Sequence, residues 1–89
     1  MNPIIGEFNR GFGNCKFTTR DPKVVSSTFM GKINETMTFS VSGVKVTPVD
    51  DLHDKLSLSL VGGENVEGVL SWRKSSTGED YVLYGLTIQ

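Results

Sequence analysis

The sequence predicts an all-β fold, a small antiparallel β-barrel of about six strands with a flexible N-terminal arm. Three observations predict it: apolar and polar residues alternate over much of the chain, turn-forming residues separate the alternating stretches, and only Asp50 to His53 offers a helical turn. The chain has 89 residues, enough for one domain, and an all-β chain of this size typically forms a small barrel or closed sandwich. We therefore expect an arm over residues 1–15 and a barrel over residues 16–89.

The arm is predicted from its glycines. Gly6, Gly11 and Gly13 oppose helix formation, and ordering them costs conformational entropy. The segment has few apolar residues whose burial could compensate for this cost. We expect residues 1 to about 13 to be less ordered than the barrel when no ligand is bound. Arg10, the basic residue of this segment, would then be able to close over a bound anion.

Alternation defines the strands of the barrel. The leucines of residues 56–60 alternate with polar residues without a fault, and residues 82–88 show the same pattern. Gly62-Gly63 and residues 76–80 supply turns on either side of the strand between them. The strands are expected, in chain order, over residues 16–19, 24–33, 37–48, 55–60, 66–72 and 82–88.

One strand changes phase along its length. Apolar residues are odd-numbered in Met37–Val41 and even-numbered in Val44–Pro48. A regular strand cannot keep both sets on one face, so we expect a bulge or tight turn at Ser42-Gly43, where glycine tolerates the backbone. Thr38 and Ser40 then share the polar face beside this bulge. The predicted core consists of Phe39, Val41, Val44, Val46, Leu56, Leu58, Leu60, Leu70, Trp72, Val82, Tyr84, Leu86 and Ile88.

Composition excludes several classes of protein. Nine Lys and Arg against ten Asp and Glu argue against a nucleic-acid binder. One cysteine, Cys15, and one histidine, His53, cannot form an intrachain disulfide or a Cys/His zinc site, and no grouping of acid, base and nucleophile indicates an enzyme. No run approaches the roughly 18 apolar residues of a membrane helix, and residues 1–10 lack the pattern of a secretory signal. We therefore expect a cytoplasmic protein that is not an enzyme and has no cofactor or metal.

The residues around the expected bulge resemble a family motif. The (Asp/Asn)-x-Ser-x-x-Gly motif of PilZ domains, small β-barrels that bind cyclic di-GMP, is similar to Thr38-Phe39-Ser40-Val41-Ser42-Gly43. Residues 16–89 also resemble PilZ domains in the order of strands and turns, and they end on Tyr84-Gly85-Leu86-Thr87-Ile88, which resembles the family's last strand. The second family motif, Arg-x-x-x-Arg, is similar in spacing to Lys16-Phe17-Thr18-Thr19-Arg20.

The resemblance implies a single-domain cyclic di-GMP effector that signals to a protein partner. The implied site lies where the Lys16–Arg20 loop faces the Thr38–Gly43 strand. Cations at that site would bind the two phosphates of the ligand, and hydrogen-bonding groups would bind its guanines. The implied ligand-binding residues are Lys16, Arg20, Thr38, Ser40, Gly43 and Arg10.

Two other functions stay open. Lys16 and Thr38 stand where the family has arginine and Asp or Asn, which favours a PilZ-like module that interacts with a protein and no longer binds nucleotide. A small barrel that binds single-stranded nucleic acid is the third candidate, because phenylalanines near the N-terminal cations offer surfaces for base stacking. The excess of acidic residues in the rest of the chain weighs against this candidate. The phenylalanines concerned are Phe8, Phe12, Phe17 and Phe29.

Overall fold

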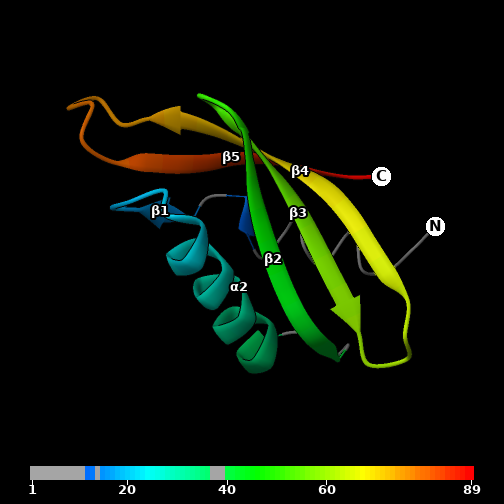
Figure 1. Ribbon diagram of the computed structural model, residues 1–89. Helices are drawn as coiled ribbons and strands as arrows, with labels where there is room; N and C mark the ends of the chain where they lie inside the picture. The colour runs from blue at the N-terminus through cyan, green and yellow to red at the C-terminus, as the bar shows by residue number, and fades with distance from the viewer. Residues whose placement is uncertain (1–11, 14, 37–39) are drawn as a thin grey trace.

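One helix and one curled antiparallel sheet make up the described fold (Figure 1). The computed structural model describes residues 12–13, 15–36 and 40–89. The elements are β1 (Lys16–Phe17), α2 (Pro22–Thr36), β2 (Val41–Asp50), β3 (His53–Leu60), β4 (Asn65–Lys74) and β5 (Tyr81–Ile88). The strands lie in the order β1-β5-β4-β3-β2, and the sheet curls into half of a barrel. The expected predominance of antiparallel strands is confirmed, but the sheet formed by the described residues has five strands and stays open.

The strand expected over residues 24–33 is wrong, because these residues belong to α2. The helix begins after Asp21, whose Oδ1 accepts a hydrogen bond from the backbone N–H two residues along at 2.8 Å. Proline follows at the first helical position, where its missing N–H costs nothing. Val25, Phe29 and Ile33 are spaced four residues apart and are all buried. This spacing is the helical signal in the sequence, and the β-branched valines at its start concealed it.

The predicted phase change in β2 is confirmed. Val41 pairs with Leu60 and Gly43 pairs with Ser59, so Ser42 is an extra residue on β2 and forms a bulge. Before the bulge an odd-numbered valine is buried, and after it the even-numbered valines turn toward the core. The bulge therefore keeps apolar residues on one face of β2 along its length.

The core lies between the concave face of the sheet and α2. Alternation located most of it, because inward and outward residues alternate along each regular strand. Phe39, another predicted core residue, lies outside the described residues. Of the predicted core residues, the buried ones are Val41, Val46, Leu56, Leu58, Leu70, Trp72 and Leu86, and the half-buried ones are Val44, Leu60, Val82 and Ile88.

The prediction that Tyr84 is buried is wrong, since this residue is 56% exposed. Ser71 pairs with Gly85 and Trp72 pairs with Leu83, which leaves Tyr84 as an extra residue on β5. This bulge turns Tyr84 outward and brings Leu83 into the core, where it is fully buried.

Two further expectations concern segments beside the sheet. Asp50 to His53, expected as a helical turn, instead closes the β2–β3 hairpin, in which Asp50 pairs with His53. The low order expected of residues 1 to about 13 concerns mainly residues 1–11, which lie outside the described part of the chain. Phe12 is fully buried, and its ring centroid lies 4.4 Å from that of Phe29.

Candidate functional site

Arg20 lies at the end of the sheet where the β2–β3 hairpin turns. Its guanidinium donates to both carboxylate oxygens of Asp54, from Nε at 3.1 Å and from Nη2 at 2.8 Å. It also donates to the backbone carbonyls of Asp50 (2.6 Å), His53 (3.0 Å) and Asp51. The hydrogen bond to Asp54 is the largest of the effects that raise the pKa of Arg20 above its ordinary value. Arg20 therefore acts as a clamp on this hairpin, with its donors directed at groups of the chain itself.

Asp54, the carboxylate that pairs with Arg20, is buried. Asp54 is 1% exposed, and its Oδ2 also accepts a hydrogen bond from Trp72 Nε1 at 2.8 Å. The Arg20 guanidinium carbon lies 5.9 Å from the ring centroid of Trp72 and 5.5 Å from that of Tyr81. A buried carboxylate is tolerated when hydrogen bonds and a cation compensate for its lost hydration, and Asp54 has both.

Lys16 is also engaged with a carboxylate. Its Nζ lies 3.1 Å from Asp80 Oδ2, although the Lys16 side chain is 65% exposed, so this ion pair is weak. A ligand phosphate at the implied site would compete with Asp80 for Lys16 and with buried Asp54 for Arg20. The second competition is the more costly one, because it leaves a buried carboxylate without its cation.

The structure does not bring Arg20 together with Ser40 and Gly43. Gly43 lies near the start of β2, whereas Arg20 contacts Asp50 at its end. Six residues of strand lie between Gly43 and Asp50, and the seven steps of about 3.3 Å amount to about 23 Å. The remaining implied ligand residues, Arg10 and Thr38, lie outside the described residues.

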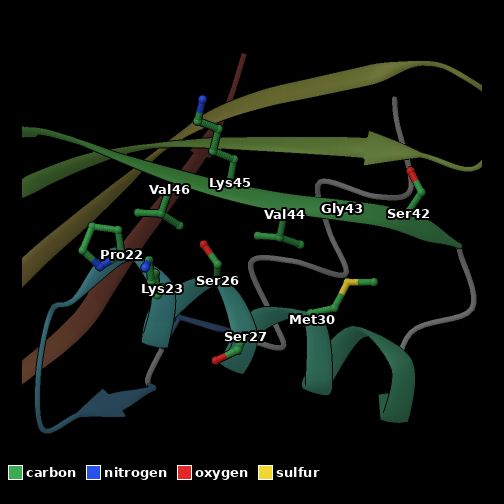
Figure 2. Close-up of a pocket in the computed structure, with 10 residues that line it drawn as sticks. All are labelled: Pro22, Lys23, Ser26, Ser27, Met30, Ser42, Gly43, Val44, Lys45 and Val46. Carbon is green, nitrogen blue, oxygen red and sulfur yellow. The ribbon is translucent and has the colours of Figure 1, made fainter.

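A groove runs between α2 and β2 (Figure 2). Its volume is ≈ 470 Å³, and it is open to solvent. Residues between Pro22 and Met30 line it on the helix side, and Ser42 to Val46 line it on the strand side. Figure 2 shows Val44 on the side of β2 that faces α2, whereas Lys45 points away from the helix. The groove therefore has an apolar strand wall, with a lysine on the opposite face of the same strand.

The hydrogen bonds of the β3–β4 hairpin fix which way the backbone of β3 points. The Leu60 N–H donates to the Glu64 carbonyl at 2.8 Å, and the Leu52 carbonyl accepts from the Trp72 N–H at 2.8 Å. Both even-numbered residues thus turn their backbone groups toward β4. Since these groups alternate in direction along an antiparallel strand, the odd-numbered residues of β3 turn theirs toward β2.

Val44 and Val46 consequently present unpaired backbone groups at the edge of the sheet. The odd-numbered residues of β3 pair with Gly43, Lys45 and Thr47, which are therefore the residues of β2 that complete the ladder. The N–H and C=O groups of Val44 and Val46 point the other way, and no strand of the described part of the chain lies on that side of β2. Among the described residues, no hydrogen bond joins these four groups to another segment.

Irregularities confine this free edge to a short stretch. The pairing of β2 shifts register at the Ser42 bulge and again between Pro48 and Asp50. Pro48 also lacks an N–H, so it cannot donate to an added strand. Bulges and edge prolines are devices that prevent uncontrolled pairing of sheet edges. What remains regular and free to pair is Gly43–Thr47.

Two lysines, Lys23 and Lys45, border the groove. Neither forms an ion pair with a carboxylate of the described part of the chain. Lys55, on the neighbouring strand, is instead paired with Glu67 at 2.9 Å. None of the described residues that line the groove is Asp or Glu. Sequence reasoning missed this site because one wall of it is the helix that alternation did not predict.

Comparisons with protein-family models, with curated proteins and with solved structures give no match to the chain. Within residues 12–13, 15–36 and 40–89, no helix combines the length and apolar character needed to cross a bilayer. The same residues contain no group of three side chains that could hold a metal ion.

Proposed function

We propose that the protein is an interaction module that receives an extended segment of a partner protein along the free edge of β2. The observation that carries the proposal is the set of outward N–H and C=O groups of Val44 and Val46 beside an open groove. An extended segment that pairs with such an edge continues the sheet, and its side chains enter the groove alternately. α2 forms the second wall and limits which side chains fit.

The backbone alone gives this contact modest affinity. Four outward groups allow up to four hydrogen bonds, each with a net contribution of about 0.5–1.5 kcal/mol. The cost of ordering the partner segment opposes this gain. Side-chain contacts with the groove must therefore supply affinity as well as specificity, which suits a reversible interaction.

Cyclic di-GMP binding, the function implied by the resemblance to PilZ domains, has less support. Arg20 would have to leave Asp54, and its guanidinium is bound at the end of β2 opposite to Gly43. Binding of single-stranded nucleic acid has less support still. Three of its four stacking candidates, Phe12, Phe17 and Phe29, are buried in the core.

A cytoplasmic location is part of the proposal. The chain has one cysteine and so gains no intrachain disulfide from an oxidising compartment. The proposal includes no chemical step, since the described residues that line the groove carry hydroxyl, apolar and lysine side chains without an acid–base pair.

Selection of peptides from a random library tests the proposal. Val44→Pro removes one outward N–H, whereas the control Val44→Ala truncates the same side chain and keeps the N–H. Selected peptides should shift the NMR signals of the Val44 and Val46 amides. They should bind Val44→Pro about tenfold more weakly than Val44→Ala, provided that thermal unfolding shows both variants folded. Peptides that bind both variants equally, or that shift signals on another face only, would overturn the proposal.

A further inference from the structure

We infer that the segment received by β2 alternates apolar and acidic residues, with a carboxylate beside Lys45. The inference rests on the proposed function and names the chemistry of the partner. It follows from which side chains of β2 point to each face of the sheet and from which of its charges are already neutralised.

The groove face of an added strand is apolar. Residues directly opposite one another on paired strands project to the same face, so partner residues opposite Val44 and Val46 turn toward α2. There they meet the valines themselves, the half-buried Met30 and Pro22. Ser26 and Ser27 add two hydroxyls to this wall, and the Ser27 hydroxyl already donates to the Val24 carbonyl at 3.0 Å. Apolar side chains at alternate positions fit such a surface, because they bury area without leaving a polar group unpaired.

The opposite face of an added strand meets Lys45. This lysine pairs across the ladder with Ser57, which carries no charge. Lys55 lies on the same face, but its charge is neutralised by Glu67. Lys45 is therefore the charged residue of β2 with which a strand added at this edge can form an ion pair. Gly43 and Thr47 flank Lys45 on the face and add no acidic group. A carboxylate on the partner residue next to Lys45 therefore forms a cross-strand ion pair.

Lys23 reinforces the preference from the helix side. It lines the groove near the start of α2 and has no ion pair among the described residues. The nearest acid in sequence, Asp21, uses its Oδ1 to cap the helix and does not line the groove. Both lysines thus favour an anionic segment, and a basic segment meets two positive charges without compensation.

Two capped peptides of about seven residues test the inference, one alternating valine with glutamate and one alternating valine with lysine. The wild-type protein should bind the glutamate peptide roughly fivefold more tightly than the lysine peptide, and added salt should reduce this difference in affinity. Lys45→Glu should reverse the preference. Lys74→Glu makes the same change of charge on β4, away from the groove, and should leave the preference toward glutamate in place.

The outcomes separate the two proposals. If both peptides shift the Val44 and Val46 amide signals with equal affinity, or if Lys45→Glu does not reverse the preference, the inference of an acidic partner segment is wrong. The proposal that β2 binds an extended segment is then unaffected. If neither peptide shifts these signals, and peptides selected from the library do not either, the proposed function fails and the inference fails with it.

Discussion

Replacement of Arg20 by methionine should destabilise the fold strongly, because the guanidinium is the cation that compensates a buried carboxylate. Asp54 is 1% exposed in the wild-type fold. Of its hydrogen bonds with described side chains, the variant keeps the one from Trp72 Nε1 and loses those from Arg20. The carbonyls of Asp50 and His53 also lose a donor. The methionine side chain replaces the apolar stem of Arg20 but none of its hydrogen bonds.

The magnitude follows from the burial of the pair. The side chains of Arg20 and Asp54 are 13% and 2% exposed, so solvent screens their interaction little. Removal of one partner of such a pair costs about 3–5 kcal/mol. A domain of 89 residues has a free energy of unfolding of about 4–13 kcal/mol, so the loss is a large fraction of the total.

Urea unfolding monitored by the fluorescence of Trp72, the chain's single tryptophan, measures the effect. Lys16→Met is the control, since its ion pair with Asp80 is exposed and should contribute no more than about 1 kcal/mol. Adding Asp54→Asn to Arg20→Met should recover part of the loss, because it removes the uncompensated charge and keeps an acceptor for the Trp72 indole. If Arg20→Met unfolds at the same urea concentration as Lys16→Met, Arg20 is not the clamp described above.

Two further predictions concern the sheet and the ligand. Gly68→Ala should cost about 1–3 kcal/mol, because its Cβ would lie 2.6 Å from the Thr87 carbonyl oxygen, whereas Gly31→Ala, with open space on α2, should raise stability by about 0.5–1 kcal/mol. Urea unfolding measures both, and equal effects would contradict the close approach of β4 and β5. Calorimetric titration with cyclic di-GMP should give no heat of binding for wild type. It should also give none for Thr38→Asp, which introduces the residue that PilZ domains have at this position. A heat of binding for either protein would favour cyclic di-GMP binding over the proposed interaction module.

Period-two alternation predicted β2 to β5 well, because it reports directly on a sheet with one buried face. The Ser42 bulge was predictable for the same reason, since the apolar phase changes on either side of it. The bulge at Tyr84 was not predictable from alternation. Apolar residues stand at consecutive positions around Tyr84, so either phase satisfies the pattern, and only packing selects Leu83 for the core.

The role of Arg20 was beyond the reach of a motif. The spacing of Lys16 and Arg20 indicates two cations in one loop, but it does not indicate where their donors point. Asp54, which takes the Arg20 donors, is 34 residues away in sequence and reaches it through the β2–β3 hairpin. In the sequence Asp54 is one of several acidic residues around a turn, and burial distinguishes it from the others.

The helix that alternation missed is also what opens the candidate site. A strand over residues 24–33 would have preceded β2 in the chain, and consecutive antiparallel strands usually pair with each other. Such a strand would have satisfied the outward groups of Val44 and Val46 and left no edge there. Because residues 22–36 form α2 instead, β2 stays at the end of the sheet with a groove beside it. The Ser42 bulge and Pro48 then shorten the usable edge to Gly43–Thr47, which lets it accept a short specific segment while opposing pairing along the whole strand.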